Sequence, residues 1–448
     1  MLPDYIAKAL PNPQGNRGAW FKNTAPSYAG VFLWVVFYEQ LAGGTLTRAG
    51  VGLSLLALLA AGLLCFGFYY FAPAMLGMKT GYPLYVVGSS TFGTTGGYLM
   101  PGLLMGLLQI GWLAVNTSLS TTYILRGAGW SEQAAVPDAL AFKLIAIAWG
   151  AIMAYIGVKG IQYVARVSLY LSLIAFLMVL LVFLRNVGGV AAYEPPDPAP
   201  LLGMAMLVQI VIGFFATAGA AGADFGMNSR NARDVKWGGL VGITVAILYA
   251  GGLPLMSVAG ANAAGHSAVT YSGVIDATVR FLASPMFLLF ALASVAPACF
   301  CAFIAGNSFA TMMPKIPRMA STMVGAAIAI TLAVTGAALN LVGVFKIVGA
   351  SFGPICGAMT ADYLLSGRKW AGPRQGINWA GYIAWALGFT VGIVDFLPVS
   401  EAVKNGCKPE VLWSYVVGFA VYALLAKAGL QPKTVEIDAP GQAGAAAV

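Results

Sequence analysis

Long apolar runs, separated by short polar connections, fill most of this 448-residue sequence. Hydrophobic residues make up 59% of the chain and charged residues only 9%, whereas a soluble globular domain carries about 25% charged residues. A helix needs about 20 apolar residues to cross the ~30 Å hydrocarbon core of a bilayer, and many of the runs reach that length. Because backbone polar groups in hydrocarbon must be satisfied within the segment, the runs predict transmembrane α-helices.

We predict an all-α integral membrane protein with twelve transmembrane helices. The predicted spans are 28–47, 53–75, 99–125, 139–157, 161–184, 201–223, 238–259, 285–310, 319–339, 342–365, 379–397 and 411–428.

Basic residues in the connections set the expected orientation. Lys and Arg cluster before the first span and after the sixth, eighth and tenth, whereas the loop after the fifth span carries Glu194 and Asp197. The positive-inside rule then predicts a bacterial-type inner membrane protein with both termini in the cytoplasm. Residues 1–27 are polar and are expected to form a cytoplasmic segment, not a signal peptide. Residues 429–448 are Ala/Gly/Pro-rich and are expected to be a disordered cytoplasmic tail. The net charge of +9 is carried by these loops, so no nucleic-acid partner is indicated.

Motifs for enzymatic chemistry and metal binding are missing from the sequence. The five cysteines include no CxxC pair and the single histidine, His266, lies alone in a Gly/Ala-rich loop, so no metal site is predicted. The chain has no GKS/GKT phosphate loop, no HExxH and no close aspartate pair. We therefore predict that the protein is not an enzyme and needs no cofactor beyond a coupling cation, H⁺ or Na⁺.

Two spans differ from simple membrane anchors. The first carries Glu39-Gln40 in its interior, followed by Gly43-Gly44-Thr45, and the sixth holds Gly213, Gly219 and Gly222. Gly-interrupted helices in corresponding positions of two halves indicate a transporter site, because an unwound helix frees backbone groups and dipole ends to hold solute. We therefore predict helices 1 and 6 to be unwound at the midplane. The alternative is that these glycines allow close helix packing.

Glu39 is the only acidic residue well inside an apolar span. A carboxylate near the bilayer centre costs at least about 2.5–3.5 kcal/mol on insertion scales, so it is expected to face a polar cavity. It is then a candidate to bind a proton, Na⁺ or a substrate rich in donors. The alternative is a carboxyl permanently paired with a neighbouring helix.

A polar and aromatic face marks the third span. Gln109, Trp112 and Asn116 share one side of the predicted helix. An indole beside two amides is suited to stack on a flat ring and to recognise its hydrogen-bonding edge, although such residues are also common in helix packing and at interfaces. Phe214-Phe215 in the sixth span can supply a second aromatic face. Adjacent helical positions point about 100° apart, so at most one of these two is expected to face the ligand.

Short motifs over most of the chain resemble the nucleobase:cation symporter family, in particular its purine–cytosine permease branch. They are Gly43-Gly44-Thr45-Leu46, Gly77-Met78-Lys79-Thr80-Gly81, Gln109-Ile-Gly-Trp112, Thr217-Ala-Gly with Ala223-Asp224-Phe225 and Arg230-Asn231-Ala232, and Ala361-Asp362-Tyr363-Leu364. The resemblance depends on the order and spacing of these short motifs taken together.

The resemblance implies a LeuT-like fold of the amino-acid–polyamine–cation superfamily. The expected organisation is two five-helix inverted repeats, 28–185 and 201–366, followed by two extra helices within 378–428. Alternating access is then expected around a midplane site formed by spans 1, 3, 6 and 8.

Residue patterns and resemblance together assign a substrate site to Glu39, Gln40, Gln109, Trp112, Asn116, Phe214, Phe215 and Cys301. The resemblance implies that Trp112 and Phe215 stack on opposite faces of the substrate ring. Gln109 or Asn116 is expected to hydrogen-bond the ring edge.

The expected ion or proton site comprises Glu39, Phe32, Val35 and Ser294. Sodium-coupled relatives use hydroxyl and amide side chains in span 8 with carbonyls of the unwound span 1. Here Pro297-Ala298 replaces the hydroxyl pair and cysteines replace the amides. Because a hard cation prefers oxygen ligands, H⁺ is favoured over Na⁺.

Together with the resemblance, these features predict a secondary active importer of a nucleobase-like heterocycle. The resemblance implies a purine or pyrimidine base, hydantoin, allantoin or vitamin precursor as the substrate. The chain is expected to work in the lipid bilayer as a monomer or weak homo-oligomer. Two alternatives remain: a transporter of the same fold for an amine-bearing or cationic solute held by Glu39, and a membrane-embedded enzyme.

Overall fold

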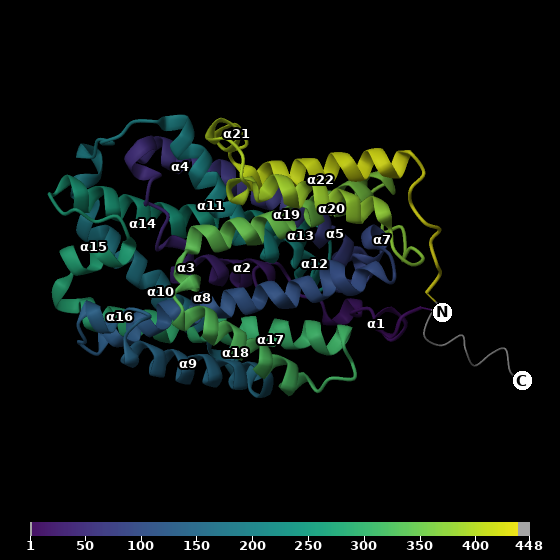
Figure 1. The fold of residues 1–448 in the computed structure, drawn as a ribbon, viewed down its shortest axis with the longest axis horizontal. Coiled ribbons are helices and arrows are strands. Elements are labelled where there is room, and N and C mark those ends of the chain that lie inside the picture. Colours follow the sequence, from purple (N-terminus) through teal and green to yellow (C-terminus); the bar gives the residue numbers. More distant parts are fainter. Residues whose placement is uncertain (1, 438–448) are drawn as a thin grey trace, which may run out of the picture.

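Helices running mostly along the long axis of the molecule make up the fold (Figure 1). The computed structural model describes residues 2–437. Within that range, β pairing is limited to isolated bridges between Gly18 and Ser229 and between Arg374 and Thr434. The observed class is therefore all-α, as the apolar runs predict.

The helices follow the predicted spans in order. Those before residue 200 are α1 (Asp4–Ala7), α2 (Thr24–Phe32), α3 (Val35–Tyr38), α4 (Leu46–Leu64), α5 (Phe71–Thr80), α6 (Leu84–Val87), α7 (Ser89–Phe92), α8 (Leu104–Gly127), α9 (Leu140–Lys159) and α10 (Ile161–Asn186). The later ones are α11 (Pro200–Ala220), α12 (Gly222–Gly226), α13 (Ala232–Gly239), α14 (Ala246–Ala263), α15 (Tyr271–Thr278), α16 (Ala283–Ala293), α17 (Val295–Met312), α18 (Arg318–Val334), α19 (Leu341–Leu365), α20 (Trp379–Gly392), α21 (Glu401–Gly406) and α22 (Glu410–Lys427).

Nine helical segments within residues 2–437 are long and apolar enough to cross a membrane. Arg318–Val334 is a shorter apolar helix, Trp379–Gly392 has 14 residues, and the predicted first span is divided between α2 and α3. These three segments account for the difference from the predicted twelve, because a broken or short helix does not reach the length of a full crossing. The chain is a multi-pass integral membrane protein.

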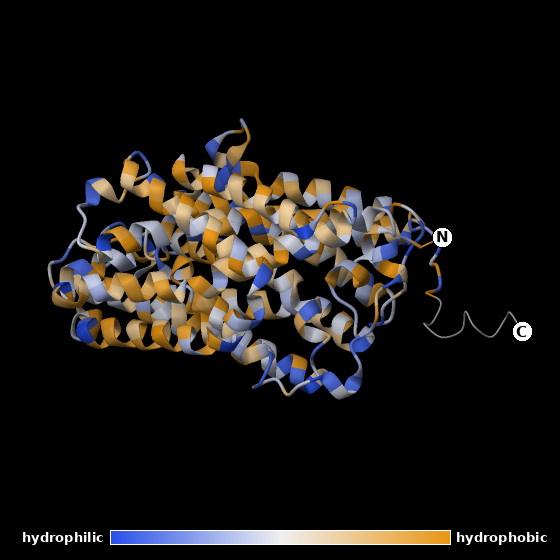
Figure 2. Cartoon of the chain, turned by 90° about the horizontal axis from the view of Figure 1, so that it is seen from below, coloured by the Kyte–Doolittle hydropathy of each residue, from blue (hydrophilic) through white to orange (hydrophobic). Residues whose placement is uncertain are grey.

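Apolar side chains cover the outside of the bundle as well as its core. On α10, Leu173, Leu177, Leu181 and Leu184 recur at helical spacing and are 45–60% exposed. Figure 2 shows hydrophobic residues along the helices and hydrophilic ones gathered towards the two ends and the connections. A monomeric soluble protein rarely exposes so continuous an apolar surface, whereas this pattern suits contact with lipid.

The first span is interrupted within the bundle. Helix α2 ends at Phe32, Trp34 is extended (φ −69°, ψ 125°), and α3 begins at Val35. Helix α3 itself ends at Tyr38, and residues 39–45 form turns that lead into α4. Glu39 therefore lies at the end of a helical segment and not in the interior of a continuous span as predicted.

The sixth span is helical through Gly213 and Gly219, since α11 runs to Ala220 and α12 begins at Gly222. A Cβ at Gly213 would lie 2.5 Å from the Phe345 carbonyl oxygen, and one at Gly219 would lie 2.7 Å from the Tyr69 Cβ. These two glycines thus permit close approach of neighbouring helices, the alternative stated for them above. An unwound midplane segment in this span stays a prediction.

Glycines also allow two backbones to approach closely between residues 77–81 and residues 222–226. A Cβ at Gly77 would lie 2.0 Å from the carbonyl oxygen of Ala223, and one at Gly226 would lie 2.1 Å from that of Ala74. Helices α5 and α12 therefore touch along their backbones, which any larger residue would prevent.

The described segments nearest the two termini contact the bundle. Arg17 Nη1 donates to the Met78 carbonyl at 2.6 Å, which holds this part of the N-terminal segment against α5. Near the other terminus, Gln375 N donates to Lys433 O at 2.9 Å and Val435 N to Pro373 O at 2.7 Å. Part of the predicted disordered tail is thus held by backbone pairing, and 438–448 lie outside the described residues.

A buried carboxylate ties three helical elements together near this end. Asp362, at the end of α19, accepts hydrogen bonds from Ser90 Oγ of α7 at 2.6 Å and from Tyr422 Oη of α22 at 2.9 Å. Arg374 Nη2 lies 3.2 Å from Asp362 Oδ1, the oxygen that also accepts from Tyr422. A buried charge is stable only when it is paired and hydrogen-bonded in this way.

Replacement of Asp362 by Ala is expected to lower the free energy of unfolding by about 3–5 kcal/mol, because it leaves the Arg374 charge buried without its partner. Thermal unfolding of the purified protein in detergent measures the effect. Glu401→Ala is the control: Glu401 pairs with Lys404 at 2.9 Å but its side chain is 79% exposed, and loss of such a pair changes stability by less than about 1 kcal/mol. Equal stability of the two variants would contradict a structural role for Asp362.

Candidate functional site

A cavity of about 1500 Å³ opens at the end of the molecule where the N-terminal segment lies. Its mouth includes residues 9–13, 21–23 and 83–85. The walls come from α2, α8, α10, α11 and α17. Lining residues on α8 are Met105, Gln109 and Trp112, spaced on one helical face, and none lies beyond Trp112.

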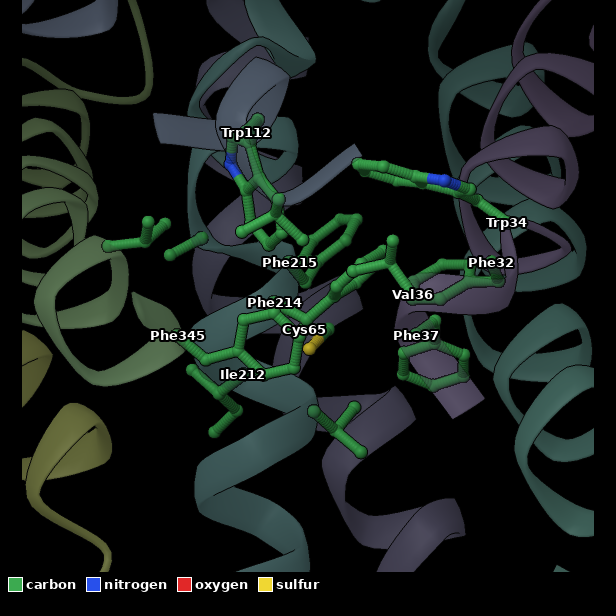
Figure 3. Close-up of a cluster of buried hydrophobic side chains, with 14 of the residues drawn as sticks. Phe32, Trp34, Val36, Phe37, Cys65, Trp112, Ile212, Phe214, Phe215 and Phe345 are labelled. Atoms are coloured by element: carbon green, nitrogen blue, oxygen red, sulfur yellow. The ribbon is translucent and has the colours of Figure 1, made fainter. Parts of the chain in front are cut away.

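Three aromatic rings close the inner end of the cavity. Trp34, Trp112 and Phe214 come from the break in the first span, from α8 and from α11, and all three line the cavity (Figure 3). The ring centroids of Trp34 and Trp112 are 5.7 Å apart, and those of Trp112 and Phe214 are 5.1 Å apart in an edge-to-face arrangement. Such clustered rings offer π-faces for a flat ligand in an otherwise apolar environment.

Uncharged polar groups accompany these rings. Gln109 lines the cavity, and its Nε2 donates a weak hydrogen bond to Met105 Sδ at 3.7 Å. Thr217 Oγ1 accepts a hydrogen bond from Trp112 Nε1 at 3.3 Å, which orients the indole. Trp34 Nε1 is buried and has no hydrogen-bond partner in the described structure. Lys22 and Asp224 are the charged residues among those lining the cavity in the described part of the chain.

Of the adjacent pair in the sixth span, Phe214 faces the cavity. Phe215 is fully buried and stacks on Phe32, with centroids 5.6 Å apart and an interplanar angle of 18° (Figure 3). Only one of the two faces the cavity, as expected for adjacent positions about 100° apart on a helix. It is not the one that the resemblance implies. The rings of Phe32 and Phe215 instead form the packed layer beneath the cavity floor.

Asn116 belongs to a buried hydrogen-bond network that connects helices. Its Nδ2 donates to the Ser294 carbonyl at 3.0 Å, and its Oδ1 accepts from Trp149 Nε1 at 3.1 Å and from Ser120 Oγ at 3.2 Å. The amide thereby joins α8 to α9 and to the junction of α16 and α17. Neither Asn116 nor Ser294 lines the cavity. Gln109, about two turns nearer the mouth, does line the cavity.

Glu39 lies beyond the inner end of the cavity. Its Oε1 accepts from Ser272 Oγ at 2.6 Å, and its Oε2 accepts from Tyr123 Oη at 3.0 Å and from Ser272 N at 3.2 Å. These bonds link the end of α3 to α8 and to α15. The side chain is 5% exposed, and neither it nor Gln40 lines the cavity.

The predicted placement of Glu39 facing a polar cavity therefore differs from the observed one, in which neighbouring donors satisfy the carboxyl. The physical reason is that a buried carboxylate is stabilised by hydrogen bonds whether they come from solvent or from protein. Its role in coupling stays a prediction.

On α17, the stretch expected to supply ion ligands has few oxygen side chains. Pro297 and Cys301 line the cavity, whereas Ala298 is fully buried and Cys299 Sγ lies 3.8 Å from Met153 Sδ. Val35 is buried at the start of α3. Within the described residues no group of three His, Cys, Asp or Glu side chains is placed to hold a metal ion.

Trp34 and Thr217 are the functional candidates that sequence reasoning missed. Trp34 lies near the middle of an apolar run, where an indole is less common than at a membrane interface. This unusual position could have identified Trp34 as a functional candidate from the sequence. Thr217 belongs to a motif that carries the family resemblance, but only the tertiary structure pairs it with Trp112.

Comparison with known proteins agrees with this architecture. A sequence model of the family described as "Permease for cytosine/purines, uracil, thiamine, allantoin" matches residues 11–418. The cytosine permease of Escherichia coli K12 is 26% identical over 396 residues, which cover 84% of this chain and 87% of that protein. These relatives are transport proteins and not enzymes.

Solved structures show the same fold. Mhp1, a nucleobase-cation-symport-1 family transporter, in a closed conformation with bromovinylhydantoin bound, superposes with a TM-score of 0.67 at 18% identity and 96% coverage of both chains. Mhp1 in its inward-facing conformation gives 0.66 at 16% identity and 98% coverage of both chains. A Na⁺-coupled sialic acid symporter gives 0.56 at 13% identity, covering 97% of this chain and 93% of the other. These likenesses establish a LeuT-like fold.

The resemblance inferred from short motifs is thus confirmed over nearly the whole chain. The protein belongs to the family of permeases for cytosine/purines, uracil, thiamine and allantoin, within the nucleobase:cation symporters.

Proposed function

We propose that this protein imports a neutral, flat, nucleobase-like heterocycle across a bacterial inner membrane by cation-coupled alternating access. The observation that carries the proposal is the aromatic end of the cavity, where Trp34, Trp112 and Phe214 meet beside the Gln109 amide. Ligand sites typically combine apolar walls with a few polar groups that fix orientation. An amide can both donate and accept, which matches the mixed edge of a nucleobase or hydantoin.

A neutral substrate is favoured over a cationic one. The charged residues on the cavity wall within residues 2–437 are Lys22 and Asp224, and Asp224 accepts a hydrogen bond from Leu84 N at 3.2 Å. Glu39, which the alternative of an amine-bearing solute requires, lies outside the lining and is occupied by Ser272 and Tyr123. An amine would enter this apolar end without a counter-charge, at considerable cost in desolvation.

Access to the cavity from one end supports an alternating mechanism. Beyond the aromatic floor, Tyr38 and Tyr271 meet edge-to-face at 5.0 Å, and Tyr123 stacks on Phe287 at 5.7 Å. Contacts of this kind close the end opposite the mouth. With both termini in the cytoplasm, the mouth faces inward and the closed end outward. We propose the twelve-span arrangement, with the repeats 28–185 and 201–366, spans 1 and 6 opening around the site, and a monomer or weak homo-oligomer as the working unit.

H⁺ is the proposed coupling cation. Pro297 and Ala298 offer no side-chain oxygen on α17, whereas the buried Glu39 carboxyl can bind and release a proton. Its hydrogen bonds to Ser272 and Tyr123 join α3 to α15 and α8. A change in its protonation would therefore alter contacts that hold the outer end closed, which is a direct way to couple a proton to opening.

Purified protein in liposomes is expected to accumulate at least one ring from a panel of cytosine, uracil, purines, hydantoin, allantoin and hydroxymethylpyrimidine. Trp112→Ala should weaken binding of that ring by about 1–3 kcal/mol, because a stacked aromatic face is lost. Ligand affinity and uptake measure the effect.

Trp413→Ala is the matched control, since Trp413 on α22 is 46% exposed on the outside of the bundle. Its affinity for the ring should equal that of the wild type. Transport of a ring with unchanged affinity in Trp112→Ala would show that the aromatic end is not the binding site, and absence of uptake of all rings would refute the proposed function.

Glu39→Gln is expected to abolish accumulation driven by a proton gradient while leaving exchange of solute across the vesicle membrane measurable, since an amide cannot take up and release the proton. Ser272→Ala is the control: it removes one donor to Glu39 but keeps the titratable group, so accumulation should persist. Full, pH-dependent accumulation by Glu39→Gln would exclude Glu39 from coupling, and accumulation that requires Na⁺ alone would reject H⁺.

A further inference from the structure

A second, smaller pocket lies where α19 and α22 begin, beside α21. Figure 1 shows α22 running from α21 towards the end of the molecule where the N-terminal segment lies, so this pocket is at the other end of that helix. Its volume is about 360 Å³, and its lining includes Lys346, Asp395 and Lys408. None of the described residues that line it also lines the large cavity. The two are therefore separate sites.

Two carboxyl groups share one ammonium group at this pocket. Lys346 Nζ pairs with the carboxylate of Asp395 and lies 3.7 Å from Glu410 Oε1. The side chains of Lys346 and Asp395 are each 18% exposed, and Glu410, the first residue of α22, is fully buried. With both carboxyls ionised, the three groups would carry a net negative charge while largely removed from water. Neighbouring like charges of this kind disfavour ionisation of both groups.

Glu410 lacks the donors that would stabilise its ionised form. Both of its carboxyl oxygens are buried, and neither receives a hydrogen bond from the described part of the chain. The buried Glu39 differs, because it accepts hydrogen bonds from Ser272 and Tyr123. An ionised carboxyl buried without donors is so costly that binding a proton is the favourable alternative. The O–H group formed in this way can donate to the adjacent Asp395 carboxylate.

The other charged groups around the pocket leave Glu410 without a second cation. Lys404 and Glu401 neutralise each other at 2.9 Å. Lys408 donates to a side chain of α21 at 3.2 Å and adds positive charge near Asp395, which favours Asp395 as the ionised member of the pair. From α11 an uncharged amide contacts the first turn of α22 at 3.1 Å.

We infer that Asp395, Glu410 and Lys346 form a proton-binding site, which holds one proton between the two carboxyls and is separate from Glu39 and from the large cavity. The pocket gives solvent access to Asp395, and through it the proton enters and leaves. With the proton bound, the three groups are neutral together and tie α19 to α22 and to the segment after α20. Loss of the proton adds a second buried negative charge and weakens this attachment.

Infrared spectroscopy of the purified full-length protein tests the site directly, because a protonated carboxyl has a C=O stretching band that an ionised one lacks. Glu410→Gln cannot bind the proton. The wild-type spectrum at neutral pH should therefore contain the band of one more protonated carboxyl than the spectrum of this variant, and the extra band should disappear as the pH rises. Glu401→Gln is the matched control: Glu401 lines the same pocket but its side chain is 79% exposed, so its spectrum should match that of the wild type.

Thermal unfolding provides a second readout. An unfolded glutamate has lost its proton above about pH 4, whereas the folded site keeps it. The wild-type melting temperature, measured relative to that of Glu410→Gln, should therefore fall as the pH rises towards the point at which the extra band disappears, and then stay level. A constant difference over this range would contradict a proton held in the folded state.

Lys346→Met provides an independent variant, in case Glu410→Gln does not fold. Removing the ammonium leaves two carboxyls without their shared positive charge, so the proton should be held to higher pH than in the wild type. Loss of the band at the same pH as in the wild type would overturn the inference. So would an equal band in wild type and Glu410→Gln, and so would a wild-type spectrum with no protonated carboxyl at neutral pH, which needs no variant.

Discussion

Satisfaction of buried polar groups is the constraint on which the rest of this structure depends. A bilayer offers no water to an unpaired donor or acceptor, so each polar side chain in the bundle needs a protein partner or a wet cavity. Asp362, Asn116 and Glu39 have protein partners, and each is hydrogen-bonded to three or more groups. Gln109 instead lies at the wall of the cavity. The distinction separates residues that hold the fold from those available to a ligand.

The interruption of the first span serves the site in the same way. Where α2 gives way to α3, the extended backbone at Trp34 directs an indole to the cavity, beside rings from α8 and α11. Continuous helices supply the remaining walls, held close by glycines such as Gly213 and Gly77 that admit neighbouring backbones. One irregular segment in a rigid frame thus shapes the pocket, because irregular backbone at membrane depth is tolerated only where protein or a cavity covers it.

Function within this family is set by side chains on a shared scaffold. In this chain the inner part of α17 carries Pro297, Cys301 and Ile304 on the cavity wall, so oxygen ligands there are few and apolar contact is extensive. Within the same stretch, Pro297 and Ala298 offer no side-chain oxygen. The proposed coupling to H⁺ rests on this composition of α17.

The sequence by itself determined the all-α membrane class, the order of the helices and the family, because hydrocarbon enforces apolar runs of a recognisable length. It also identified Trp112 and Gln109, whose spacing on one helical face is a local property. Tertiary structure alone decided which of Phe214 and Phe215 faces the cavity. It also decided that Asn116 hydrogen-bonds to a neighbouring helix and that Glu39 is hydrogen-bonded to Ser272 outside the cavity. Each of these depends on partners distant in the chain, and the composition of a span contains no information about which neighbour will satisfy its polar groups.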